Sequence, residues 1–169
     1  MVSRVRVFIS WSGEGSPSHE VAKALNAWIR NVIQVAEPFL SSDDIQPGDR
    51  WNDIIGRELD DSGFGILCVT RDVLNSPWML FEAGALAGGY KNPKRVCPYL
   101  LNVSRSDLKP PLSQFSAVTA DRDGTFRMMQ SLNTTGAGPL IPDDILKRSF
   151  TVFWDELEAA LKDIRKAER

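Results

Sequence analysis

The sequence has 169 residues, of which 43% are hydrophobic and 25% charged, and its formal net charge at pH 7 is -2. This size and composition fit one globular domain with a sizeable core. No stripe of Lys and Arg stands out, which argues against direct nucleic-acid binding. No apolar run approaches the ~20 residues of a membrane span, and the first residues alternate in polarity, unlike a signal peptide. We therefore expect a cytoplasmic protein with no membrane partner.

Four segments at the amino end predict a strand, a helix, a strand and a helix in turn. Residues 4–11 alternate in polarity as a strand does, and residues 36–41 form a short second strand. Each strand is followed by a loop and an amphipathic helix. The apolar positions at helical spacing are Val21, Leu25, Trp28, Ile29 and Val32 in the first helix, and Trp51, Ile54, Ile55 and Leu59 in the second.

The alternation continues with a buried strand and a third helix. Residues 64–70 are almost all apolar, as expected of a parallel strand covered on both faces, so we predict that they form the centre of the sheet. The helix over residues 75–89 has Ser76 as its N-cap and Pro77 at its first position.

Two further strands and a long helix complete the predicted elements. Residues 95–101 form a fourth strand, in which Pro98 indicates a bulge or a position near the sheet edge, and residues 115–120 could form a fifth. Residues 133–144 are expected to be a connector. The final helix has a long apolar stripe of Leu146, Phe150, Phe153, Trp154, Leu157, Leu161 and Ile164.

This order of elements predicts an α/β fold, with an open, mostly parallel five-stranded sheet and helices on both faces, in the flavodoxin-like arrangement. In such sheets, ligands bind outside the carboxyl ends of the strands. The loops expected to carry a site are therefore 10–18, 42–51 and 70–77.

The cysteines and the single histidine do not suggest a metal site or a nucleophile. Cys68 and Cys97 lie within the apolar runs GILCV and RVCPYLL, so we expect both to be core residues in a reducing cytoplasm. One histidine and two strand cysteines cannot supply a three-ligand metal site without carboxylates, so no metal is expected. His19 has no nucleophile elbow beside it, which favours a surface or capping role.

The loop SWSGEGSPS, after the first strand, could direct backbone N–H groups toward a phosphate. It contains no P-loop lysine, and Ser18 occupies the position of the third glycine in G-x-G-x-x-G. A plain flexible turn fits the same residues.

Glu82 stands within NSPWMLFEAGALAGG, in the second turn of the predicted third helix. Its neighbours one helical turn away are uncharged: Trp78, Met79, Ala85 and Leu86. Such surroundings disfavour the ionised carboxylate unless a donor comes from another segment. The residues alone leave open whether Glu82 does chemistry or pairs with Arg71, Arg50 or a loop N–H.

The sequence resembles the Toll/interleukin-1 receptor (TIR) domain family, in particular its prokaryotic NAD-cleaving members. Four stretches in the expected order carry the resemblance: VFISWSGE, DIQPGDRW, GILCVTRDVLNSPWMLFEAGAL and RVCPYLL. The third is the most specific, because a strand ending in Thr or Ser is followed by S-x-W and then an acid. The likeness implies a TIR core over residues 1–134. Residues 135–169 would be an extension whose amphipathic helix packs on the same domain and could lead into a linker.

The resemblance implies that NAD is cleaved between nicotinamide and ribose, with Glu82 as the catalytic glutamate. NAD would be the substrate, and no cofactor is implied. A carboxylate in a low-dielectric pocket can stabilise an oxocarbenium-like ribose, which is the chemistry this cleavage needs. By the same resemblance, Ser10, Trp11 and Ser12 would line the nicotinamide end of the pocket.

The loop after the second strand has two implied roles. Trp51 could stack on a ring of the substrate or open a helix in the core, and Arg50 could meet a phosphate or remain an exposed charge. The resemblance also implies head-to-tail self-association, which tends to form filaments. The residues expected to contact the neighbouring copy are Asp44, Ile45, Pro47 and Gly48.

Three functions are compatible with the sequence. The first is an NAD glycohydrolase that releases nicotinamide and either ADP-ribose or a cyclised ADP-ribose, in prokaryotic antiviral defence, with a fused or separate sensor module as partner. The second is a catalytically silent TIR module that scaffolds signalling. The third is an enzyme resembling nucleoside deoxyribosyltransferases, in which a glutamate attacks the sugar.

Overall fold

The computed structural model describes residues 5–40, 63–74, 95–110, 112–135 and 138–168. Within these residues, five parallel strands form one sheet in the order β2-β1-β3-β4-β5. This is the strand order of flavodoxin-like folds and confirms the predicted fold class. The strands are β1 (Val5–Ser10), β2 (Ala36–Leu40), β3 (Phe64–Val69), β4 (Arg95–Leu100) and β5 (Val118–Thr119).

Strand β3 lies at the centre of the sheet, between β1 and β4, as predicted. All six of its residues are buried, which explains why its sequence is apolar without alternation. Its register with β1 pairs Val7 with Phe64 and Ser10 with Leu67, so the carboxyl ends of the two strands lie at the same edge.

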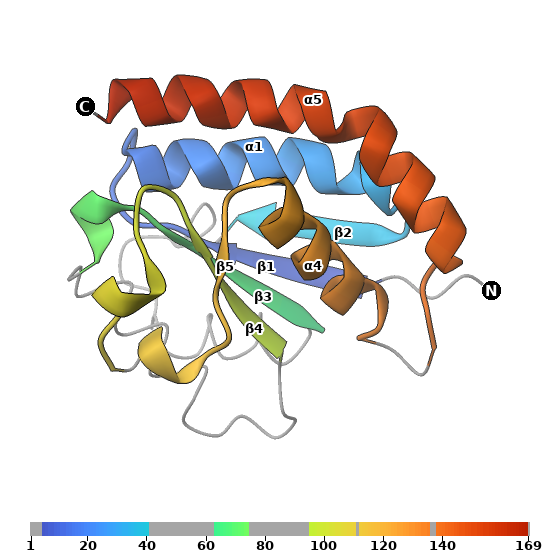
Figure 1. Ribbon diagram of the computed structural model, residues 1–169. Helices are drawn as coiled ribbons and strands as arrows, with labels where there is room; N and C mark the ends of the chain where they lie inside the picture. The colour runs from blue at the N-terminus through green and yellow to red at the C-terminus, as the bar shows by residue number, and fades with distance from the viewer. Residues whose placement is uncertain (1–4, 41–62, 75–94, 111, 136–137, 169) are drawn as a thin grey trace, which may run out of the picture.

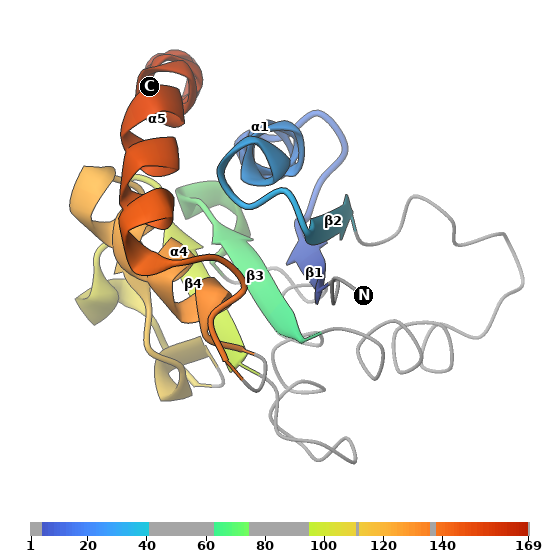
Figure 2. The same cartoon turned by 90° about the vertical axis from the view of Figure 1, so that its right-hand side faces the viewer.

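In the described part of the chain, three helices cover one face of the sheet, namely α1 (Pro17–Val32), α4 (Arg122–Asn133) and α5 (Asp143–Ala167). Figures 1 and 2 show α1 and α5 lying side by side above the strands, with the start of α1 and the end of α5 at the same end of the molecule. The predicted apolar positions of the first helix are all buried. In α5 the predicted stripe is buried except for Phe153, which is partly exposed.

A second apolar cluster lies on the opposite face of the sheet. Its buried members are Phe8, Leu67, Val69, Val73, Leu100, Val103, Leu112 and Ala117. The described elements on this side are short 3-10 turns, η1 (Arg71–Val73), η2 (Arg105–Asp107) and η3 (Leu112–Gln114). The helices predicted over 51–62 and 75–89 lie outside the described residues.

Helix α4 is an element that the sequence reasoning missed. It begins at the N-cap Asp121, whose carboxylate accepts a hydrogen bond from the Gly124 N–H at 2.7 Å. Gly124 and Thr125 in its first turn are poor helix formers, so packing of Met128 and Leu132 into the core overrides the local propensity. The Gly124 position excludes a side chain, because a Cβ there would lie 2.1 Å from the Thr119 carbonyl oxygen.

Strand β5 is shorter than the predicted 115–120 and pairs with β4 only at Tyr99 and Leu100. Phe115 instead extends the η3 turn, since its N–H donates to the Leu112 carbonyl at 3.3 Å. Pro98 lies near the edge of the sheet, as the sequence allows: β4 is next to the edge strand β5, and the ladder with β5 begins one residue after Pro98.

An aromatic cluster joins the three helices of the covered face. The Phe150 ring of α5 lies edge-on to Trp28 of α1 (centroids 5.7 Å apart) and to Phe126 of α4 (5.0 Å), and it stacks on Trp154 (5.5 Å). The Trp28 Nε1–H donates to the Phe153 carbonyl at 2.8 Å, so α1 and α5 are also joined by a hydrogen bond.

Replacing Phe150 with Ala should lower the free energy of unfolding by about 3–5 kcal/mol, because it removes the shared ring and leaves a cavity between three helices. Urea denaturation followed by circular dichroism measures this loss. The matched control is Val152→Ala two residues later, where the side chain is 71% exposed and the expected change is within about 0.5 kcal/mol. Equal losses in both variants would contradict the packing described for α5.

Both cysteines are buried, as predicted, and Cys97 is 7% exposed. Burial raises the pKa of the Cys97 thiol from 9.0 to about 12. Burial likewise raises the pKa of the Tyr99 hydroxyl above its ordinary 10.0, although a 2.6 Å hydrogen bond with Thr125 opposes the shift.

The free energy of unfolding should therefore fall as the pH rises above 9, since the unfolded thiol ionises from that pH while the folded thiol stays protonated up to about 12. Tyr99 adds to the fall above pH 10. Urea denaturation at pH 8 and at pH 10.5 measures the difference. Cys97→Ala should reduce this difference, and an unchanged dependence on pH in that variant would refute the assignment to Cys97.

Candidate functional site

The carboxyl ends of β1 and β3 meet where the strand order reverses, with β2 on one side of β1 and β3 on the other. Open α/β sheets bind ligands at this switch point. Ser10, Trp11 and Ser12 come at the end of β1, and Thr70 and Arg71 come directly after β3. Two of the three loops expected to carry the site therefore begin at one place.

Ser10 is a buried hydroxyl at this edge. It is the last residue of β1, is 0% exposed, and lies opposite Leu67, which belongs to the cluster on the face away from α1. Its Oγ has no hydrogen-bond partner among the described residues. A buried hydroxyl without a partner costs about 1–3 kcal/mol, so a ligand group that bonded to it would recover that cost.

Trp11 faces the other side of the sheet. It packs in the cluster beneath α1 and α5, is 8% exposed, and stacks on His19 with ring centroids 3.7 Å apart and an interplanar angle of 12°. Its Nε1 has no partner within the described part of the chain. Ser10 and Trp11 therefore do not face one common pocket, and one face of the indole ring is already occupied.

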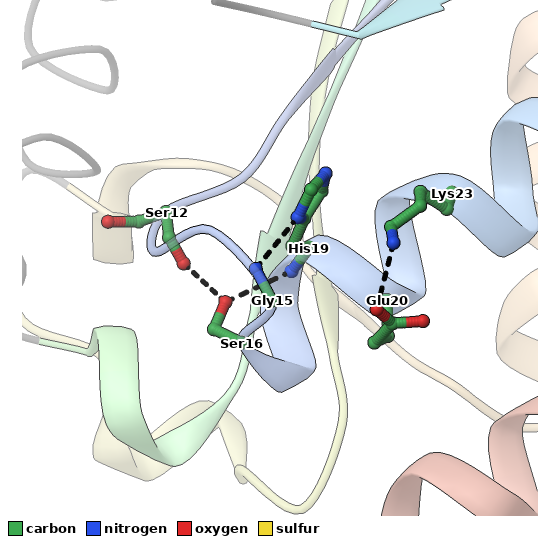
Figure 3. A network of polar contacts seen from close by, with 6 residues as sticks. All are labelled: Ser12, Gly15, Ser16, His19, Glu20 and Lys23. Atoms are coloured by element: carbon green, nitrogen blue, oxygen red, sulfur yellow. Dashed lines mark hydrogen bonds and ion pairs between the residues drawn. The ribbon is translucent and has the colours of Figure 1, made fainter.

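The loop between β1 and α1 is bonded within itself (Figure 3). The Ser16 hydroxyl donates to the Ser12 carbonyl at 2.6 Å and accepts from the His19 N–H at 3.2 Å. The Gly15 N–H donates to His19 Nδ1 at 3.0 Å, and Gly13 and Gly15 adopt φ values of +86° and +74°. The sequence favours a surface or capping role for His19; in the structure Ser16 is the N-cap of α1, while His19 accepts a loop N–H and its ring packs on Trp11.

These bonds decide whether the loop can cradle a phosphate. The N–H groups of Ser12, Gly15 and Ser16 all donate to groups within residues 12–19, and Pro17 has no N–H to offer. A phosphate cradle needs several neighbouring N–H groups that point outward. These three N–H groups are therefore already bonded within the loop and are not free to bind a phosphate.

Ser18 links this loop to the central strand. It is 0% exposed in the first turn of α1, and its Oγ donates to the Cys68 carbonyl at 2.7 Å. The same oxygen accepts the Ser12 N–H at 3.2 Å. Sequence reasoning noted Ser18 only as a substitute for a glycine, because nothing in the local pattern indicates a partner 50 residues away.

The last turns of α5 contact the same edge of the sheet. The Glu168 carboxylate accepts from the Arg71 N–H at 3.2 Å and from the Asn102 Nδ2 at 2.7 Å. The Arg71 Nε–H donates to the Asn102 carbonyl at 3.1 Å, and Arg165 donates to the Ala120 carbonyl. The segments after β3, β4 and β5 are thus tied to one helix end. The sequence reasoning did not predict these contacts.

Residues 7–132 match the family model described as TIR domain, which is more than half of the chain. The chain belongs to the TIR domain family. The matched segment includes the carboxyl end of β1, the loop after it and β3, so the edge described above lies within the TIR domain. Helix α5 follows the matched residues and packs on α1 through Trp28.

Two solved structures are similar to the chain at low sequence identity. The TIR domain is similar to the TIR domains of the activated Roq1 resistosome, which directly recognises the pathogen effector XopQ, at 17% identity and a TM-score of 0.46, covering 96% of this chain and 82% of that one. It is also similar to an azoreductase from Bacillus anthracis str. Sterne, at 10% identity and a TM-score of 0.47, covering 96% and 99%. Neither likeness carries an argument about activity. The search of curated proteins found no match.

Several predicted site residues lie outside the described residues of the TIR domain and stay predictions. They are the catalytic Glu82, the substrate residues Arg50 and Trp51, and the association residues Asp44, Ile45, Pro47 and Gly48. In the described ranges, no three His, Cys, Asp or Glu side chains come together to hold a metal ion. None of the helices described there is both long and apolar enough to cross a bilayer.

A hollow of about 390 Å³ lies away from the carboxyl edge, between β4, β5 and α4. Arg95 and Arg127 line it together with Phe115 and Ser131. The Arg95 guanidinium is held in place, since it donates to the Ser131 carbonyl at 3.0 Å and to the Thr134 hydroxyl at 2.8 Å. Arg95 is the first residue of β4, so the hollow lies at the opposite end of the strand from the switch point. Ligand binding at the switch point can therefore be compared with binding in this hollow.

Proposed function

We propose that this TIR domain is an NAD glycohydrolase that breaks the bond between nicotinamide and ribose. The observation that carries the proposal is the buried Ser10 hydroxyl at the switch point of the sheet, which has no hydrogen-bond partner among the described residues. The segment predicted to contain Glu82 begins shortly after β3, which ends at the same edge. A hydrogen-bonding group and a carboxylate would thus flank one substrate.

The reaction needs charge stabilisation more than proton transfer. The electron pair of the C1′–N bond moves to the nicotinamide ring and neutralises its positive charge, so the leaving group needs no acid. The ribose becomes oxocarbenium-like, and the Glu82 carboxylate stabilises this cation in a site of low dielectric. Water then adds to C1′ and loses a proton, which gives ADP-ribose, or a nitrogen of the adenine adds and gives a cyclised ADP-ribose.

Ser10 and Ser12 would bind the nicotinamide end of NAD. A serine hydroxyl offers one donor and two acceptor positions, which suit the carboxamide of nicotinamide. Trp11 would act on the pocket only indirectly, from the opposite face of the sheet, because its ring packs on His19. No cofactor takes part, since NAD is the substrate.

The biological role that we propose is prokaryotic antiviral defence in the cytoplasm. Loss of NAD would halt an infected cell, and a cyclised ADP-ribose would act as a signal. Because constant NAD cleavage would harm the cell, the activity needs a trigger, so a fused or separate sensor module is the expected partner.

Incubation of the purified protein with NAD tests the proposal, at a high protein concentration at which the predicted self-association is complete and with release of nicotinamide measured by liquid chromatography. A parallel incubation with a deoxynucleoside and a second free base tests for transfer of deoxyribose. Nicotinamide release without deoxyribosyl transfer supports the NAD glycohydrolase. Transfer of deoxyribose with intact NAD favours the deoxyribosyltransferase chemistry, and loss of neither substrate favours a silent scaffold.

A further inference from the structure

We propose that Ser18 is a positioning residue of the active site, whose hydroxyl sets the separation between the end of β1 and the end of β3. This inference rests on the proposed function, because the two strand ends are the parts that would face NAD. It assigns a role to a residue outside the predicted substrate-binding set.

The geometry of Ser18 differs from that of an ordinary helix cap. Ser16 is the N-cap of α1, and its hydroxyl bonds only to the loop and to the first turn of the helix. The Ser18 hydroxyl instead reaches across to β3, where it donates to the Cys68 carbonyl at 2.7 Å. It also accepts the Ser12 N–H at 3.2 Å, so one buried oxygen joins three segments.

The two bonds act on the residues that matter for the proposed reaction. Ser12 is two residues after Ser10, whose hydroxyl is buried at the switch point. Cys68 is one residue before the end of β3, and the chain after it continues through Thr70 and η1 toward the segment predicted to contain Glu82. The Ser18 hydroxyl therefore fixes the end of β1 relative to the end of β3, from which the chain leads to that segment.

A hydroxyl at this position can do what other small side chains cannot. Its single oxygen donates to one segment and accepts from another at the same time. Alanine fills nearly the same space but loses both bonds, so the loop after β1 can shift relative to β3. A displacement of about 1 Å between reacting groups can cost on the order of 100-fold in rate.

The test compares Ser18→Ala with a matched control, Ser149→Ala. The Ser149 hydroxyl of α5 also lies within hydrogen-bond distance of two groups, the Asn31 and Val32 carbonyls at 3.1 and 2.9 Å, but at the far end of α1. We expect Ser18→Ala to lower kcat for NAD cleavage at least tenfold with KM changed less than threefold. Ser149→Ala should leave both constants within twofold of the wild type.

A second measurement follows the hydrogen bonds of Ser18 directly and does not depend on the reaction. Amide hydrogen exchange at Ser12 should become at least tenfold faster in Ser18→Ala and stay unchanged in Ser149→Ala, because only the first variant removes the acceptor of that N–H. If Ser18→Ala does not fold, Ser18→Cys keeps the size of the side chain and weakens both bonds. The same fall in kcat is then expected.

Two results would overturn the inference. One is a kcat in Ser18→Ala, or in Ser18→Cys if Ser18→Ala does not fold, equal to that of Ser149→Ala. The other is a rise in KM with kcat unchanged, which would indicate a binding contact instead of positioning. A wild-type protein that leaves NAD intact even at high protein concentration contradicts the proposed function. In that case, unchanged amide exchange at Ser12 in the Ser18 variant also refutes the claim that Ser18 holds the two strand ends together, whereas faster exchange supports that claim.

Discussion

Glu82→Gln should lower kcat for NAD cleavage to less than about a tenth of the wild-type value, a loss of more than ~1.4 kcal/mol of transition-state stabilisation. The amide keeps the shape of the side chain but carries no negative charge for the oxocarbenium-like ribose. KM should change little, since the charge acts on the transition state more than on bound NAD. Initial rates of nicotinamide release over a range of NAD concentrations measure both constants.

The matched control is Glu156→Gln, which makes the same chemical change at an exposed position of α5. Its kcat should equal that of the wild type, and both variants should keep the wild-type circular dichroism spectrum. More than about a tenth of wild-type kcat in Glu82→Gln would refute the catalytic role. Unfolding of that variant alone would instead indicate that Glu82 is a structural acid.

Activity per molecule should rise with protein concentration, because the predicted association loop completes the pocket of a neighbouring copy. Pro47 and Gly48 are expected to set a turn in this loop, and Ile45 offers an apolar contact among acidic residues. A monomer would then have low basal turnover. Head-to-tail contacts repeat without closing, so filaments should form as activity rises.

Ile45→Asp and Gly48→Pro should abolish the rise with concentration while leaving the monomer folded. Val152→Asp is the control, since it adds the same charge to an exposed position of α5 that the prediction does not involve. Nicotinamide release at a series of protein concentrations, with particle size followed by light scattering, measures both effects. A constant specific activity from dilute monomer to high concentration would count against association as the trigger.

The strongly patterned elements could be predicted from the sequence. The continuous apolar run of β3, the helical spacing of α1 and the long stripe of α5 each reflect burial that the structure confirms. Helix α4 could not be predicted, because Gly124 in its first turn is a poor helix former. The glycine is needed there for the close contact of the helix with β5. The length of β5 depends on which residues of β4 pair with it, and the sequence of β5 alone does not specify this pairing.

The location of the candidate site could be predicted from topology, but its internal contacts could not. The rule that ligands bind at strand ends indicates the loops 10–18, 42–51 and 70–77, whereas the choice of Ser10 and Ser12 within them comes from the resemblance to TIR domains and stays a prediction. By contrast, the Ser18 contact joins residues 50 positions apart, and the contact between Arg71 and Glu168 joins residues 97 apart. Such contacts depend on how the helices pack on the sheet, which local periodicity does not specify.

Titration of nicotinamide into the isotopically labelled wild-type protein tests most directly whether the switch point is the substrate site. Nicotinamide is a product of the proposed reaction, so it binds without being consumed. We predict amide chemical-shift changes concentrated at Ser10, Ser12 and Thr70, where the ends of β1 and β3 meet. Changes confined to the hollow lined by Arg95 and Arg127, or no change at saturating nicotinamide, would contradict an NAD-cleaving site at this edge.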